Sequence, residues 1–179
     1  MKNFFYLLAA AVFFTSCKKE VDALPEATQT GANTFGARLD GDFWIPQKFG
    51  IAPTAPLLEA RYTGTNGIFI NARNFSSSPT ETEFEIHLKN ITGTGVFQLN
   101  QQTNKYPQES ASYGYFIKRK FMPLNEWITG PQHTGTVNVT KFDTQNHIIS
   151  GTFSFNAGSV DNTAAAISVT EGRFDVKIQ

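Results

Sequence analysis

The sequence is almost without cysteine, since Cys17 is the only one among 179 residues. One thiol excludes a disulfide framework within the chain and a zinc site built from paired cysteines. An excess of charge of either sign is also missing, because 15 lysine and arginine side chains balance 15 aspartate and glutamate side chains. A chain without a strong electrostatic field is not expected to bind nucleic acid. A hydrophobic core must hold it together, and a domain of about 150 residues is large enough for one.

Recognisable catalytic and metal-binding motifs are missing as well. His87, His133 and His147 are scattered singly, with no His-Glu-x-x-His pattern and no cysteine partner. We interpret each as a solvated or hydrogen-bonded residue and predict neither a metal site nor a cofactor. The sequence has no Gly-x-Ser-x-Gly elbow and no phosphate-binding glycine loop. We therefore expect a protein that is not an enzyme.

The nearest approach to paired carboxylates is the series Glu81, Glu83 and Glu85. In a strand, residues two apart place their side chains on one face, at about 6.6 to 7 Å. That spacing could suit a calcium ion or an acid and base pair. The same face continues into His87 and Lys89, which is typical of an ordinary strand surface. We interpret it as solvent-facing.

Long hydrophobic runs are missing, too. The apolar run Phe4–Phe14 has eleven residues. As a helix rising about 1.5 Å per residue it would reach roughly 16 Å, half of the roughly 30 Å hydrocarbon core of a membrane. It follows the positive charge of Lys2 and precedes the small pair Thr15-Ser16, which is the anatomy of a secretory signal peptide. We assign residues 1–16 to this signal peptide.

The position of the single cysteine suggests its use. Phe14-Thr15-Ser16-Cys17 resembles the lipobox of bacterial lipoproteins, with Phe14 in place of the usual leucine. The resemblance implies that Cys17 becomes the mature N-terminus and carries three acyl chains, whereas a stable membrane hold needs about two. Lys18, where an aspartate can retain such proteins at the inner membrane, implies the outer membrane, on its periplasmic or cell-surface face. The alternative is an ordinary secreted protein with a chance cysteine near its cleavage site.

Residues 17–32 contain charged and small polar side chains and Pro25, with almost nothing to bury. We predict a lipidated cysteine followed by a flexible tether. A disordered segment of this length would span roughly 20 to 25 Å. The remaining residues, 33–179, are expected to form a single domain.

Alternation of apolar and polar residues predicts strands in this domain, and no segment after Cys17 shows a helical period over three turns. We predict an all-β antiparallel domain of about nine or ten strands, either a sandwich or a barrel. Asp40-Gly41 and Asn66-Gly67 stand between such segments and favour tight hairpin turns. The alternating apolar residues are Phe84, Ile86 and Leu88; Phe153 and Phe155; and Phe174, Val176 and Ile178.

Two longer interruptions, residues 100–111 and 121–134, are candidate binding loops, because binding residues concentrate on loops. Aromatic residues in or between them could form a platform for a sugar ring or a peptide, so that the partner would be a glycan or a protein. The other interpretation, which the high aromatic content favours, is that these rings belong to the core. The candidate residues are Tyr106, Tyr113, Tyr115 and Trp127.

Three stretches, "NTFGARLDGDFWIP", "ISGTFSF" and the closing "ISVTEGRFDVKI", resemble a family of uncharacterised Bacteroidota lipoproteins known only as a domain of unknown function. The resemblance implies a lipid-anchored, β-rich envelope protein and brings no catalytic residues. We expect a non-catalytic binding module, which should expose Trp127 and Tyr113. The alternative is a structural or accessory envelope lipoprotein in which these rings are buried.

Overall fold

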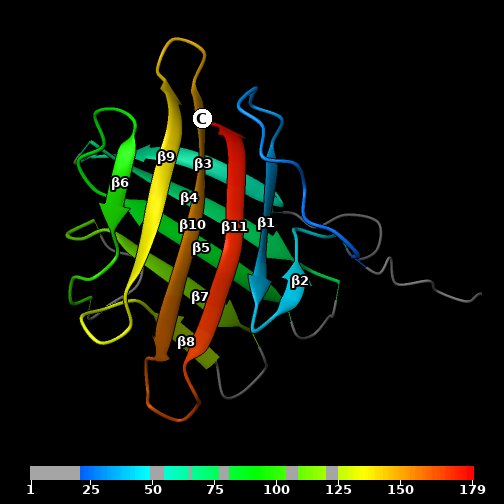
Figure 1. Cartoon of the computed structure of the whole chain (residues 1–179), viewed down its shortest axis with the longest axis vertical. Coiled ribbons are helices and arrows are strands. Elements are labelled where there is room, and N and C mark those ends of the chain that lie inside the picture. The colour runs from blue at the N-terminus through cyan, green and yellow to red at the C-terminus, as the bar shows by residue number, and fades with distance from the viewer. Residues whose placement is uncertain (1–20, 49–54, 65, 77–80, 104–108, 120–124) are drawn as a thin grey trace, which may run out of the picture.

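The computed structural model describes residues 21–48, 55–64, 66–76, 81–103, 109–119 and 125–179. All regular secondary structure in these ranges is β, which confirms the predicted fold class (Figure 1). The same ranges contain no helix that is long and apolar enough to cross a membrane. The strands are β1 (Thr34–Leu39), β2 (Asp42–Trp44), β3 (Leu58–Thr63), β4 (Gly67–Asn74), β5 (Thr82–Leu88), β6 (Gly95–Gln98), β7 (Tyr113–Lys118), β8 (Asn125–Ile128), β9 (Gly135–Asp143), β10 (Ile148–Ser159) and β11 (Ile167–Lys177).

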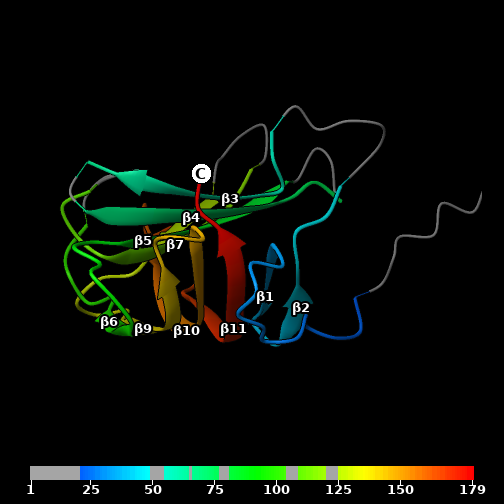
Figure 2. The same cartoon turned by 90° about the horizontal axis from the view of Figure 1, so that it is seen from above.

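The strands form one curled antiparallel sheet in the order β2-β1-β11-β10-β8-β7-β5-β4-β3, with β9 beside β10 and β6 beside β9. Figure 2 shows two layers, in which β1, β2, β6, β9, β10 and β11 face β3, β4, β5 and β7. β10 joins the layers, because it pairs along most of its length with β9 and then, at Ser159, with Trp127 of β8. On the other side, a bridge between Ala60 and Ile178 connects β3 to the end of the chain. The result is a sandwich-like or barrel-like sheet.

The core lies between the layers and contains the alternating apolar residues of the sequence pattern. Phe84, Ile86 and Leu88 of β5 are fully buried and share one cluster with Phe153 of the opposite layer. Trp44 packs edge-on against Phe84, with the two ring centroids 4.7 Å apart. Burying one such side chain stabilises the fold by about 1.5–3 kcal/mol. This burial supplies the stability that disulfides cannot give.

The Asp40-Gly41 hairpin turn is present as predicted, whereas Gly67 of the second predicted pair is already the first residue of β4 and pairs with Thr63. Asp40 and Gly41 have φ angles of 51° and 97°, and they connect Leu39 of β1 to its partner Asp42 in β2. Positive φ at both central residues is the geometry that favours an Asp-Gly pair. Asn66, with a φ of 53°, precedes β4, which pairs with β3 as expected.

The structure has eleven strands in the described ranges rather than nine or ten. The additional strand, β8, lies inside the predicted loop 121–134. Only Trp127 of its four residues is buried, so its sequence shows no alternation. The closing stretch "ISVTEGRFDVKI" forms one long strand, β11, from Ile167 to Lys177.

One buried carboxylate fixes the N-terminal part of the described chain to β11. Asp175 exposes only 1% of its surface. It accepts hydrogen bonds from the hydroxyls of Thr28 (2.6 Å) and Ser150 (2.7 Å) and from the backbone N–H groups of Gly31 (2.8 Å) and Ala32 (3.1 Å). Burial alone would raise the pKa of Asp175, but these hydrogen bonds outweigh it and hold the pKa well below its ordinary value. We call this set of contacts the Asp175 clamp.

The Asp175 clamp corrects the prediction that the whole of residues 17–32 is a flexible tether. Residues 28–32 are part of the domain, and Arg173 also reaches the carbonyl oxygen of Pro25 (3.4 Å). Backbone N–H groups bind the carboxylate, and the amino-acid composition of residues 17–32 cannot predict contacts that the backbone makes. The predicted signal peptide 1–16 and Cys17 lie outside the described residues.

Candidate functional site

A cleft of about 630 Å³ lies where both predicted binding loops meet the connection between β10 and β11, which is at the lower end of Figure 1. Gln102 and Thr103 come from the first predicted loop, and residues 128–133 come from the second. The volume falls within the range of about 300–1,000 Å³ that is usual for small-ligand sites. The lining residues are Gln102, Thr103, Ile128, Thr129, Gly130, Pro131, Gln132, His133, Gly158, Ser159, Val160, Asn162, Ala164 and Ala166.

Hydrogen bonds between the loops shape one wall of the cleft. The buried hydroxyl of Thr103 donates to the carbonyl oxygen of Thr129 (3.1 Å), and the hydroxyl of Thr129 accepts from the backbone N–H of Gly114 in β7 (3.1 Å). The chain then turns tightly, since Gly130 and His133 exchange two backbone hydrogen bonds of 2.8 and 3.2 Å. The first loop is thereby tied to the end of β8 and to β7.

The opposite wall is shaped by Asp161, which follows β10. Its carboxylate accepts hydrogen bonds from the hydroxyls of Thr163 and Ser159, each at 2.7 Å, and these bonds lower the pKa of Asp161 to about 2. The next residue, Asn162, has a φ of 57°. An asparagine tolerates this left-handed backbone better than most residues. The turn therefore places Asn162 in the lining of the cleft.

The lining is polar and uncharged, because it contains no aspartate, glutamate, lysine or arginine. The His133 ring lies directly on Gly158, where any β-carbon would overlap it. Val160 is 49% exposed and adds an apolar surface. Such a set of groups can donate and accept hydrogen bonds but offers no carboxylate for acid or base catalysis.

The aromatic residues singled out in the sequence do not line this cleft. Trp127 is 7% exposed, packs against Phe116 in the core and donates from Nε1 to the carbonyl oxygen of Ala165 (2.8 Å). Tyr113 and Tyr115 are fully buried on the other face of the layer. An exposed platform of these three rings is therefore not present: Trp127 belongs to the core, and Tyr113 and Tyr115 belong to a separate buried cluster. Tyr106 lies outside the described residues.

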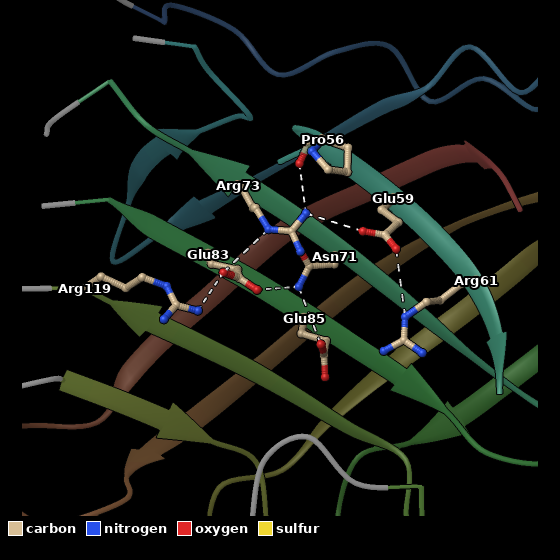
Figure 3. A network of polar contacts seen from close by, with 8 residues as sticks. All are labelled: Pro56, Glu59, Arg61, Asn71, Arg73, Glu83, Glu85 and Arg119. Atoms are coloured by element: carbon tan, nitrogen blue, oxygen red, sulfur yellow. Dashed lines mark hydrogen bonds and ion pairs between the residues drawn. The ribbon is translucent and has the colours of Figure 1, made fainter. Parts of the chain in front are cut away.

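The outer face of β5 is not the solvent-facing surface that the sequence suggested. Glu85 is 3% exposed, and Glu83 is also buried. Figure 3 shows both carboxylates within a network that reaches neighbouring strands. The Asn71 amide of β4 donates to both of them, and the Tyr113 hydroxyl of β7 donates to Glu85 (2.7 Å). Alternation along one strand cannot reveal such partners, because they come from the strands on either side.

Arginines compensate the negative charge in this network. Glu83 lies 3.0 Å from Nη2 of Arg119 and 3.8 Å from Nε of Arg73. Arg73 in turn donates to the carbonyl oxygen of Pro56 (2.9 Å) and contacts Glu59 (3.5 Å). Burial of a carboxylate lowers the stability of the fold unless the carboxylate is paired in this way. Glu83 is therefore a member of an ion-pair network rather than one half of an acid and base pair.

His87 is fully buried and hydrogen-bonded in β5, which is the second of the two interpretations that the sequence allowed for it. Burial is the main reason why its pKa is lowered. Its Nδ1 lies 2.6 Å from the carbonyl oxygen of Ala111, which can only accept, so Nδ1 carries the proton. The Phe69 ring packs against it, with the centroids 4.4 Å apart. Among the described residues, no group of three histidine, cysteine, aspartate or glutamate side chains could hold a metal ion.

A second, larger cleft of about 1010 Å³ lies at the other end of the sheet, between β3 and the end of β11. It contains side chains of both signs, such as Lys48, Glu59 and Lys177. Among the described residues, its lining includes His147 but no member of the two predicted loops and none of the candidate aromatic rings. The neutral cleft is therefore the stronger candidate.

Fold and site together define an all-β domain with a neutral cleft formed by loops at one end. The chain belongs to the family of the domain of unknown function DUF6252, whose sequence profile matches residues 32–176. The match covers nearly all of the predicted domain 33–179 and agrees with the resemblance to a family of unknown function. Searches of curated proteins and of solved structures found no match.

Proposed function

We propose that the protein is a lipid-anchored binding module of the cell envelope, held at the outer membrane through Cys17 and binding a glycan or protein in the neutral cleft. The observation that carries this proposal is the cleft itself. Residues 102–103 and 128–133, from the two loops that the sequence marks as binding candidates, meet there with the β10–β11 connection. Loops placed on a rigid sheet are a common location for binding sites.

The position of the N-terminal segment supports a membrane-anchored arrangement. The chain approaches β11 near Arg173, and β11 begins beside the cleft at Ile167. Six residues of strand correspond to about 20 Å. An anchor that precedes residue 21 would therefore attach the domain to the membrane at a point away from the cleft. The cleft would then stay accessible.

A non-catalytic role fits the chemistry of the site. Glu83 and Glu85 are the residues that most resemble an acid and base pair, and both lie on the outer face of β5. Glu83 is bound by Asn71 and by arginines, and Glu85 accepts a hydrogen bond from Tyr113. The cleft is lined by amides, hydroxyls and one imidazole. The amides and hydroxyls suit recognition, and the single imidazole has no carboxylate partner in the lining.

The second candidate is a structural or accessory envelope lipoprotein without a small ligand. The burial of Trp127, Tyr113 and Tyr115 favours it, because exposed aromatic rings would be the usual anchors of a ligand. The two candidates share the anchor and differ in the use of the cleft.

Mass spectrometry of the intact protein from a bacterial membrane fraction tests the anchor. We expect a chain that begins at Cys17 with added acyl groups, and an unacylated chain for Cys17→Ser. Ser16→Ala, which keeps a small side chain before the cysteine, is the control and should remain acylated. Protease treatment of whole cells then distinguishes the cell surface from the periplasmic face. An unmodified, soluble wild-type chain would refute the anchor.

A further inference from the structure

We infer that the neutral cleft binds an uncharged saccharide. This inference rests on the proposed function, because it names the ligand class for the same site. Its first support is charge: all lining residues belong to the described part of the chain, and none of them is an aspartate, glutamate, lysine or arginine. A charged ligand would lose hydration there without a counter-charge. Acidic sugars and phosphate groups are usually bound by arginine or lysine, which the lining does not offer.

Hydrogen-bonding capacity is the second support. The side chains of Gln132, His133 and Asn162 line the cleft, and none of the three makes a hydrogen bond to another side chain or backbone group among the described residues. Each amide presents a donor and an acceptor side by side, and imidazole can do both. Neighbouring hydroxyls of a sugar also donate and accept, so they can pair with these groups without leaving a charge unpaired.

Apolar surface in the same cleft is the third support. Ile128, Pro131 and Val160 lie among the polar groups, and Val160 is 49% exposed. A sugar ring has C–H faces as well as hydroxyls, so a mixed lining of this kind fits it. Burial of such faces adds favourable free energy in proportion to the apolar area.

A peptide added as an extra strand fits the cleft less well. That mode of binding requires an unpaired strand edge. At the cleft, β8 already pairs with β7 on one side and with the end of β10 on the other, through Ile128 and Trp127. The observations therefore favour a saccharide over an extended peptide.

Calorimetry on the full-length protein in detergent micelles tests the inference. The probes are neutral oligosaccharides derived from glucans, mannans, xylans and galactans, acidic oligosaccharides of similar length, and uncharged peptides. We expect binding of at least one neutral oligosaccharide. Gln132→Ala and Asn162→Gly should each weaken it about fivefold to tenfold, the effect of one lost hydrogen bond. Glycine at 162 retains the positive φ of that position.

Gln98→Ala is the matched control, because Gln98 is an exposed glutamine on β6 outside the cleft, and it should bind like the wild type. Thermal unfolding verifies that the variants are folded. If acidic sugars or peptides bind and the cleft variants weaken their binding, the inferred ligand class is overturned but the proposal of a binding module is retained. If neutral sugars bind equally well to all variants, the assignment to this cleft is overturned. If no probe binds, both the ligand class and the proposed use of the cleft are overturned.

Discussion

At the scale of single residues, Asp175 is the most connected polar group of the described chain. It joins the N-terminal segment to β10 and β11 through Thr28, Gly31, Ala32 and Ser150. These donors form hydrogen bonds with both carboxylate oxygens. They stabilise the buried negative charge, which therefore links the N-terminal segment to β10 and β11. The domain therefore begins earlier than composition indicates.

Replacing Asp175 should be costly. Asparagine has a single acceptor oxygen, and a hydrogen bond to a charged group contributes about 1.5–3 kcal/mol. We predict that Asp175→Asn lowers the free energy of unfolding by about 2–3 kcal/mol, measured by urea denaturation. Asp143→Asn, at the end of β9 where the carboxylate accepts exposed hydrogen bonds from the following turn, is the control and should have a far smaller effect. Equal losses would contradict the structural role of the Asp175 clamp.

The lowered pKa of Asp175 also predicts a pH dependence. The unfolded carboxyl takes up its proton near pH 4, whereas the folded carboxyl does so only at a lower pH. The contribution of Asp175 to stability is therefore complete above about pH 4 and is lost as the pH falls toward the folded pKa. The difference in unfolding free energy between wild type and Asp175→Asn should shrink over this interval. A difference that stays constant from pH 6 to pH 2 would argue against an ionised clamp.

The pair of Tyr113 and Glu85 couples β7 to β5. Their hydrogen bond of 2.7 Å is buried, so removing the hydroxyl leaves an acceptor with one donor fewer. We expect Tyr113→Phe to lower the free energy of unfolding by about 1–2 kcal/mol. The loss should be smaller when Glu85→Gln is already present, which a double-mutant cycle measures. Tyr62→Phe, at an exposed tyrosine of β3, is the control; additive effects of Tyr113→Phe and Glu85→Gln would show that the pair is not coupled.

At the scale of elements, the β1–β2 hairpin depends on Gly41. Its φ of 97° suits glycine, and no atom lies within 4 Å of the place of a β-carbon, so an alanine there would be strained only through its backbone. We predict that Gly41→Ala lowers the free energy of unfolding by about 1–2 kcal/mol. Gly93→Ala has equally open surroundings and no positive φ, so it should be close to neutral. Similar losses at both positions, measured by thermal unfolding, would contradict this account.

The strands and loops differ in how far the sequence predicts them. Strands with one apolar face, such as β5 and β11, were predictable because the alternation of apolar and polar residues is a local property. β8 was not, since four residues with one buried ring form no pattern. The two loops of the cleft were predictable from their lack of alternation, but the part of the lining around Asn162 was not. Asn162 lies in the β10–β11 connection, which is distant in sequence from the first loop.

At the scale of the whole molecule, the course of β10 explains both the fold and the cleft. This strand pairs with β9 in one layer and ends beside β8, which belongs to the other. Where the two layers separate, the connections after β8 and β10 lie next to each other and leave the cleft between them. The N-terminal segment is fixed elsewhere on β11, so the proposed membrane attachment and the cleft lie at different points along the same strand.

Hydrogen exchange of the full-length protein, with and without a mixture of neutral oligosaccharides, tests the central claim that the cleft binds a ligand. We predict slower exchange in residues 128–133 and 158–166 when the oligosaccharides are present. The turn of residues 143–148, at the opposite end of β10, should be unchanged and serves as an internal control. Unchanged exchange throughout, or protection confined to the opposite end, would contradict the account.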